Sequence, residues 1–68
     1  MLSARNQLKG TIRAINVGGI MAEVIIRISP KIEVVSVITR TSAESMKLKV
    51  GDEVSAVIKS TEVMVNKD

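Results

Sequence analysis

Apolar side chains recur with a period of two between Ile20 and Ser29. Every even-numbered position up to Ile28 is apolar, whereas the polar residues Glu23, Arg27 and Ser29 all occupy odd positions. A period of two residues is the signature of a β-strand with one buried face. This segment therefore predicts a strand in a mainly β protein.

Further segments of the same character lie on both sides of this strand. Gly18-Gly19 suits a two-residue hairpin in which both glycines adopt a positive φ, and Ser29-Pro30-Lys31 marks the next turn. Thr41 to Glu44 matches a capping box and predicts one or two helical turns. Strands are expected at residues 11–17, 20–28, 32–39, 53–59 and 61–65. Five short strands with one short helix predict a small OB-like five-stranded barrel, with residues 1–68 as a single domain.

The chain has few means of stabilising a monomer. A domain of this length buries only about 60% of its unfolded surface. With no Cys, Phe, Tyr or Trp, the chain has neither disulfides nor the large apolar area of an aromatic side chain. Several apolar side chains also fall on the face opposite their strand's main apolar set: Ile25, Val35, Val37, Val57 and Met64. Exposed apolar patches usually mark interfaces, so we expect a homo-oligomer.

The composition argues against an enzyme and against direct metal ligation. There is no His to act as a general base or metal ligand, and no paired-carboxylate or phosphate-loop spacing. The apolar runs are too short to span a bilayer, and the chain opens without a signal peptide. We therefore expect a soluble cytoplasmic binding protein with no membrane partner.

The net charge of +3 fits an anionic partner. Single-stranded nucleic acids stack on aromatic side chains, which this chain lacks. Arg5, Lys9 and Arg13 could still follow phosphates, so nucleic acid is an alternative although we expect none as the partner.

Both ends of the chain combine a cation with neutral hydrogen-bond donors. Residues 3–10 contain Arg5 and residues 58–64 contain Lys59, and neither cation has an acidic neighbour. Fixed cations surrounded by hydroxyl and backbone N–H donors suit a small, multiply charged oxyanion. The alternative is that Arg5 and Lys59 are ordinary surface charges, since no spacing rule links them.

Five segments of the chain together carry a family resemblance: Ser3-Ala4-Arg5-Asn6-Gln7-Leu8-Lys9-Gly10, Ala22-Glu23-Val24, Val37-Ile38-Thr39, Leu48-Lys49-Val50-Gly51-Asp52-Glu53-Val54 and Val57-Ile58-Lys59-Ser60-Thr61-Glu62-Val63-Met64-Val65. In these segments the chain resembles the molbindins, the small molybdate- and tungstate-binding Mop proteins built from a single TOBE-type domain. The resemblance covers essentially the whole chain and departs at residues 29–33, where relatives tend to be richer in glycine.

The resemblance implies an OB-like fold whose subunits exchange the N-terminal strand and assemble as a hexamer, a trimer of dimers. It implies oxyanions bound between subunits by Ser3, Ala4, Arg5, Thr39, Lys59 and Ser60. A second site type lies on the threefold axes of the family, for which Gly18, Gly19 and Ile20 are the candidates.

The expected function is storage or buffering of molybdate, and of tungstate, without a cofactor. A nucleic-acid-binding barrel and a purely structural oligomerisation module are the alternatives.

Overall fold

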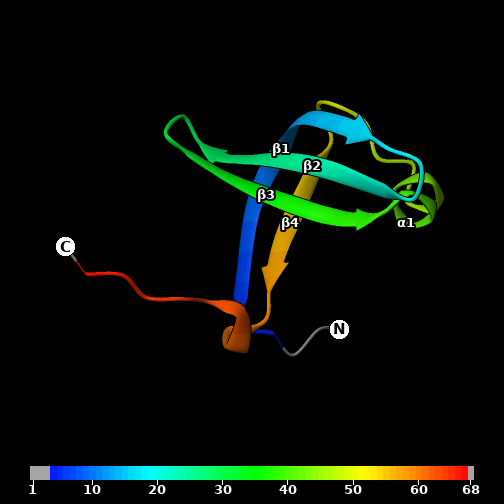
Figure 1. The fold of residues 1–68 in the computed structure, drawn as a ribbon. Coiled ribbons are helices and arrows are strands. Elements are labelled where there is room, and N and C mark those ends of the chain that lie inside the picture. The colour runs from blue at the N-terminus through cyan, green and yellow to red at the C-terminus, as the bar shows by residue number, and fades with distance from the viewer. Residues whose placement is uncertain (1–3, 68) are drawn as a thin grey trace.

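A computed structural model describes residues 4–67 and contains one curled antiparallel sheet with a short helix at one end (Figure 1). The strand order in the sheet is β3-β2-β1-β4. The elements are β1 (Asn6–Val17), β2 (Met21–Ser29), β3 (Ile32–Thr39), α1 (Arg40–Ser45), β4 (Glu53–Ile58) and the single 3₁₀ turn η1 (Ser60–Glu62). The mainly β architecture with one short helix is as expected from the sequence. None of the helices in residues 4–67 is long and apolar enough to cross a membrane.

Strand β1 bends and pairs with two other strands. Its first half pairs with β4, from Asn6 opposite Ile58 to Thr11 opposite Glu53, and its second half pairs with β2. In Figure 1 the first half of β1 and β4 form an arm that descends from the layer made by the rest of the sheet. This bend lets one long strand form two sides of an open half-barrel.

Gly10 lies where β1 crosses close to β2. A Cβ atom at Gly10 would lie 2.6 Å from the main-chain oxygen of Arg27 and within 2.9 Å of the side chains of Ile26 and Ile28. A side chain therefore does not fit at this position, which is a typical reason for glycine inside a strand. Gly10 permits the close approach that the bend requires.

The core confirms the period-two pattern of β2. Ala22, Val24 and Ile26 are buried, and Val24 and Ile26 pack with Ile12 of β1 and Ala56 of β4. Alternate residues of a strand point to the same face, so these three side chains fix which face of the sheet is covered.

The hairpin between β1 and β2 differs from the prediction by one residue. Gly18 N–H donates to the carbonyl of Met21 at 2.8 Å, so the chain turns at Gly19 and Ile20. Neither glycine takes a positive φ, and Ile20 is outside β2 and 79% exposed. The register that buries Ala22 against β1 sets this turn, and it overrides the local preference of a Gly-Gly pair.

The helix is present but begins before the predicted capping box. Its N-cap is Thr39, whose Oγ1 accepts a hydrogen bond of 3.0 Å from the N–H of Ser42. At the other end Lys47 takes a φ of 54°, and Leu48 N–H bonds the carbonyl of Ala43 at 3.1 Å. A left-handed residue with this bond pattern ends a helix as a Schellman motif.

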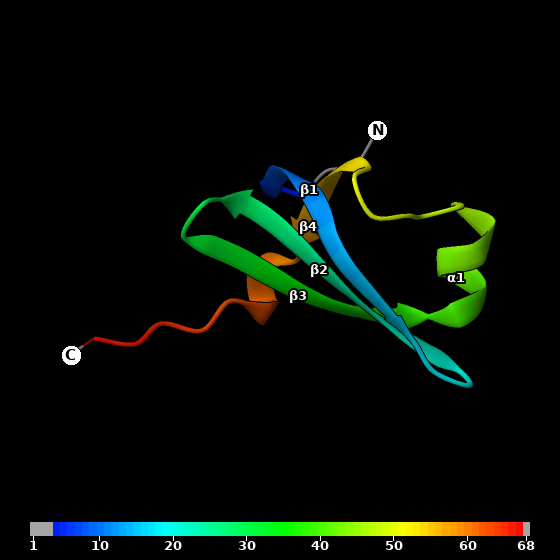
Figure 2. The ribbon, with the colours of Figure 1, turned by 90° about the horizontal axis from the view of Figure 1, so that it is seen from above.

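The predicted strand at residues 61–65 is not formed. The sheet of residues 4–67 has four strands, and the chain instead makes the η1 turn and then an irregular segment. Glu62 N–H bonds the carbonyl of Lys59 at 2.9 Å, and this turn directs the chain away from the sheet. Figures 1 and 2 both show the C-terminal segment extending away from the strands. The structure therefore does not confirm the predicted fifth strand: residues 4–67 form a four-stranded half-barrel, because the η1 turn directs the last segment away from the sheet.

Candidate functional site

The end of the β1–β4 ladder brings the two predicted cations beside each other. Asn6 pairs with Ile58, so Arg5 and Lys59 are the next residues beyond that pair. Both are exposed, and neither has a hydrogen-bond or ion-pair partner for its side chain among residues 4–67. Two adjacent cations without a carboxylate partner make a local positive field that suits an anion.

The segment carrying Arg5 is held by a side chain that the sequence did not single out. Gln7 Nε2 donates a hydrogen bond of 2.7 Å to the carbonyl of Ala4. This bond spans Arg5 and fixes the bend of the main chain just before β1. A glutamine near a strand end carries no signal in the sequence, so only the structure reveals this role.

Of the other predicted site residues near the two cations, the structure describes Ser60 and Ala4. Ser60 follows Lys59 in the chain, begins η1 and is exposed. Ala4 is half-buried and precedes Arg5. Ser3 lies outside the described residues.

Thr39 lies at the opposite end of the sheet. It pairs with Met21 across β2 and β3, and the next residue, Arg40, donates its N–H to the carbonyl of Ile20 at 2.7 Å. Figure 1 shows α1 and the β1–β2 turn together, far along β1 from the N-terminal end and η1. A single chain therefore does not bring Thr39 to Arg5 and Lys59.

The hydroxyl of Thr39 is already engaged within its own chain. It accepts from Ser42 N–H and donates to Ser42 Oγ at 2.8 Å. Its one proton can reach an anion only if the bond to Ser42 Oγ is given up. The same end of the sheet holds Gly18, Gly19 and Ile20, which are exposed.

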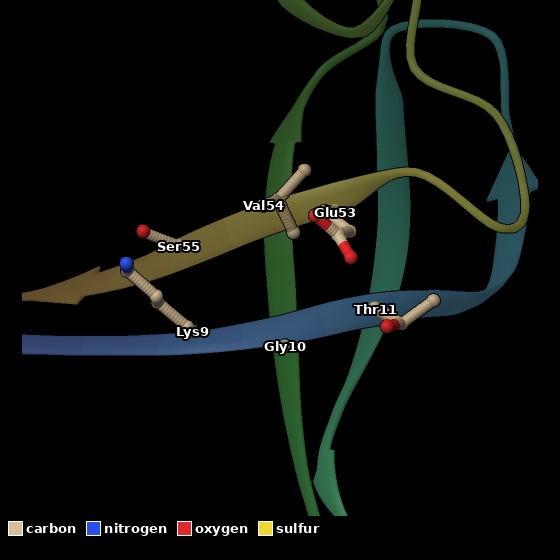
Figure 3. A pocket seen from close by; sticks show the side chains of 6 residues that line it. All are labelled: Lys9, Gly10, Thr11, Glu53, Val54 and Ser55. Carbon is tan, nitrogen blue, oxygen red and sulfur yellow. The ribbon is translucent and has the colours of Figure 1, made fainter.

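An open groove of about 500 Å³ lies on the arm formed by the paired strands β1 and β4. Lys9 and Ser55 meet at one end of it, and Glu53 and Thr11 lie at the other (Figure 3). The carboxylate of Glu53 would repel a negatively charged ligand bound in the same groove. This groove therefore suits a multiply charged anion less well than the end that carries Arg5 and Lys59.

A second groove, of about 590 Å³, separates the two outer strands of the sheet. It is lined by Val34 to Val37 of β3, by Ser55 to Ile58 of β4, by Ile26, and by Lys59 and Glu62. The groove is thus continuous with the end of the chain that holds the cation pair. Sequence reasoning did not find it, because it exists only once the sheet has curled.

One carboxylate holds two arginines on the outer face of the sheet. Two nitrogens of the Arg13 guanidinium contact the carboxylate of Glu33: Nη2, at 3.2 Å from Oε1, and Nε, which contacts Oε2. Arg27 Nη2 lies 3.5 Å from the same Oε2. The hydrogen bond from Arg13 is the main reason that the pKa of Glu33 lies below its usual value. Glu33 therefore neutralises the charge of Arg13. Arg13 is one of the three cations, with Arg5 and Lys9, that could follow the phosphates of a nucleic acid, so this set is weakened.

Comparison with known proteins places the chain in a family. A TOBE domain model matches residues 2–65. Molybdenum-pterin-binding protein 3 of Clostridium pasteurianum is 47% identical over 64 residues, which make up 94% of each chain. The molybdenum transport protein ModE of Azotobacter vinelandii is 46% identical over 93% of this chain, which spans only 23% of ModE.

Solved structures agree with this placement. MopII from Clostridium pasteurianum, in an apo form, matches with a TM-score of 0.92 and 40% identity over 98% of this chain and 100% of its own. The cytoplasmic molybdate-binding protein ModG, solved with molybdate bound, matches with a TM-score of 0.82 and 40% identity over 88% of this chain and 43% of its own. The names of these relatives are those of binding and transport proteins, not of enzymes. The chain belongs to the TOBE-domain family, in its small Mop (molbindin) branch.

Proposed function

We propose that this chain binds molybdate, and also tungstate, at subunit interfaces of a homo-oligomer and so stores or buffers the anion in the cytoplasm. The observation that carries the proposal is the adjacency of Arg5 and Lys59, two exposed cations without an acidic partner in the described chain. The names of the relatives, which include a cytoplasmic molybdate-binding protein, support the choice of anion and compartment.

The binding mechanism follows from the donor types. A tetrahedral dianion carries two charges and only acceptor oxygens, so it needs cations for charge and neutral donors for shape. Arg5 offers a planar fork and Lys59 a point charge. The hydroxyls of Ser3 and Ser60 and a main-chain N–H near Ala4 would complete the shell. None of these groups is expected to change the anion chemically.

A second subunit would supply what one chain lacks. Arg5 and Lys59 are open to water in the single chain, and water weakens each charge–charge interaction. Covering them with a neighbour lowers the local dielectric and strengthens the charge-assisted bonds. Thr39 lies too far along its own sheet to take part, so we propose that it reaches the site from another subunit.

The proposed assembly is a hexamer, a trimer of dimers of single-domain chains whose N-terminal strands exchange. The arm formed by the first half of β1 with β4 projects from the rest of the sheet (Figure 1), so it is the part of the chain that we expect a neighbour to contact. Gly18, Gly19 and Ile20 remain the candidates for a second site type, with Thr39 close to them at the same end of the sheet.

Isothermal titration of molybdate into Arg5→Ala and Lys59→Ala tests the site. We expect each substitution to abolish tight binding while the oligomer persists, as measured by sedimentation. Lys31→Ala is the matched control, because Lys31 is an exposed lysine in the β2–β3 turn, away from the site. Unchanged affinity in both site variants would contradict the assignment.

One set of titrations separates this function from the alternatives. Molybdate, tungstate, sulfate and a short single-stranded DNA are each added to the purified protein while heat and melting temperature are followed. Binding of the DNA with a steep salt dependence and no competition by molybdate would indicate a nucleic-acid-binding barrel. No response to any anion would leave a structural oligomerisation module.

A further inference from the structure

The single turn η1 places a carboxylate beside one of the two cations of the proposed site. Glu62 N–H donates to the carbonyl of Lys59 at 2.9 Å, which closes the turn. A 3₁₀ turn brings the side chains of residues i and i+3 to the same side of the chain. Lys59 and Glu62 accordingly both line the groove of about 590 Å³. The two opposite charges face one open space.

No ion pair joins these two side chains. None of the ion pairs in residues 4–67 includes Lys59 or Glu62, and neither side chain has a hydrogen-bond partner there. Both are exposed. Attraction between exposed charges is weak, so it is the main-chain bond of η1 that keeps them near each other. Both charges are therefore available to act on a ligand.

Glu62 is the carboxylate closest to the cation pair along the chain. Arg5 and Lys59 are the next residues beyond the last pair of the β1–β4 ladder, and η1 follows at once. On the other side of Lys59, the first acid is Glu53, at the start of β4. With a rise of about 3.3 Å per strand residue, Glu53 lies about 20 Å from Lys59. Only Glu62 shares the end of the chain that carries the cations.

The carboxylate of Glu62 opposes a bound dianion in two ways. It lowers the positive potential that Lys59 presents to a ligand, and it repels the ligand itself. The repulsion is twice as strong for a dianion as for a monoanion, because the Coulomb energy is proportional to the charge. The groove beside the two residues has apolar walls formed by Val35, Val37 and Val57. Such walls exclude water and focus the field, so the repulsion is screened less than in open water.

We propose that Glu62 limits the affinity of the anion site at Arg5 and Lys59, so that a bound dianion is held reversibly. The inference rests on the proposed function and adds a regulating group to the same site. A fully ionised oxyanion has only acceptor oxygens, so it cannot make a hydrogen bond to the carboxylate. A store has to release its anion, and one negative charge beside the two cations supplies that release.

Glu62→Gln tests the proposal, because glutamine keeps the size of the side chain and removes its charge. In calorimetric titration at an ionic strength of about 0.1 M, the variant should bind molybdate about fivefold more tightly than the wild type, the effect of one weakly screened charge. Glu62→Asp keeps the charge and should bind as the wild type does. Equal affinity of Glu62→Gln and the wild type would overturn the proposal.

Glu53→Gln is the matched control. It changes the net charge by the same amount, and Glu53 is also exposed. The distance of about 20 Å from Lys59 is two Debye lengths at about 0.1 M ionic strength, so molybdate affinity should stay at the wild-type value. Equal tightening in Glu53→Gln and Glu62→Gln would show that net charge acts and that the position of Glu62 does not, which also overturns the proposal.

Salt separates an electrostatic role of Glu62 from a structural one. Raising the ionic strength from about 0.1 M to about 1 M shortens the Debye length from about 10 Å to about 3 Å. The ratio of the molybdate Kd values of the wild type and Glu62→Gln should therefore fall toward one. A ratio that does not change with salt would assign the effect to an altered η1 turn and contradict the proposal. Sedimentation of both proteins checks that they assemble alike.

The same titrations distinguish failure of this inference from failure of the proposed function. If the wild type binds molybdate and Glu62→Gln binds it equally, the function stands and the role of Glu62 is wrong. If neither protein binds molybdate, both proposals are wrong. Binding detected in Glu62→Gln alone would support both.

Discussion

Gln7 and Ala4 are joined by a hydrogen bond of 2.7 Å from the side-chain amide to the main-chain carbonyl. The bond encloses Arg5 in a small loop at the start of β1. Arg5 has a long side chain and no partner of its own in the described chain, so the loop limits where its guanidinium can be presented. Gln7 is thus a positioning residue for the proposed anion site.

Gln7→Met should lower the affinity for molybdate about tenfold, the effect of losing one hydrogen bond that orders the site. Methionine keeps the length of the side chain but cannot donate. Calorimetric titration measures the affinity, and the melting temperature of the anion-free protein should change little because Gln7 is exposed. In Thr11→Val, an exposed position on the same face of β1, affinity should stay at the wild-type value. Wild-type affinity in Gln7→Met would show that the loop does not position Arg5 for the anion.

Gly10→Ala should destabilise the fold by about 1–3 kcal/mol, the usual cost of forcing an extra carbon into a packed site. The new Cβ would meet the main-chain oxygen of Arg27 at 2.6 Å, and a main-chain atom cannot rotate away. Urea unfolding followed by circular dichroism measures the change. Gly19→Ala is the control, because a Cβ there meets nothing within 4 Å and Gly19 has no positive φ. Equal stability of the two variants would show that β1 can bend without glycine.

Glu33 should make the fold less stable in acid. Its pKa lies below the usual 4.5, chiefly because Arg13 donates a hydrogen bond to the carboxylate. In the unfolded chain the carboxylate takes up a proton at higher pH than in the folded chain. The stabilisation is therefore fully present above the unfolded pKa and is lost as the pH falls through the folded pKa.

NMR titration of the Glu33 carboxyl carbon measures this shift, and urea midpoints against pH measure its consequence. Arg13→Met should raise the pKa of Glu33 more than Arg27→Met does, because Arg13 is the larger cause and Arg27 the more distant partner. In Glu33→Gln the loss of stability in acid should be smaller than in the wild type. A larger effect of Arg27→Met would reverse the assignment of the main partner.

The parts of the fold that follow from local pattern were predictable from the sequence. The alternation through Ala22, Val24 and Ile26 gave the buried face of β2, since a period of two has only one way to face a core. The turn at Gly19 and Ile20 could not be placed, because the register of buried side chains moved it by one residue.

Non-local geometry accounts for the rest. That Arg5 and Lys59 are neighbours depends on the pairing of β1 with β4, which no local pattern contains. Gly10 reads as an ordinary glycine until the close approach of Arg27 is seen. The segment at 61–65 has the composition of a strand, but the η1 turn directs it away from the sheet, and it pairs with none of the four strands.

Variants of Thr39 can distinguish its role as a helix cap from a role as an anion ligand. Its hydroxyl accepts from Ser42 N–H and donates its only proton to Ser42 Oγ. Thr39→Val removes the cap and should lower the free energy of unfolding by about 1 kcal/mol. If Thr39 also donates to the anion from a neighbouring subunit, the same variant loses molybdate affinity, whereas Thr39→Ser keeps both properties.

Ser42→Ala separates the two roles further. The substitution keeps the main-chain N–H of residue 42, which donates to Thr39 Oγ1, so the helix cap is kept. It removes Ser42 Oγ, which accepts the hydrogen bond from the Thr39 hydroxyl. That proton is then free for the anion, and we expect affinity equal to or above the wild type with an unchanged urea midpoint. Should Thr39→Val lose stability but bind molybdate as tightly as the wild type, Thr39 is a helix cap alone, and the site is complete without it.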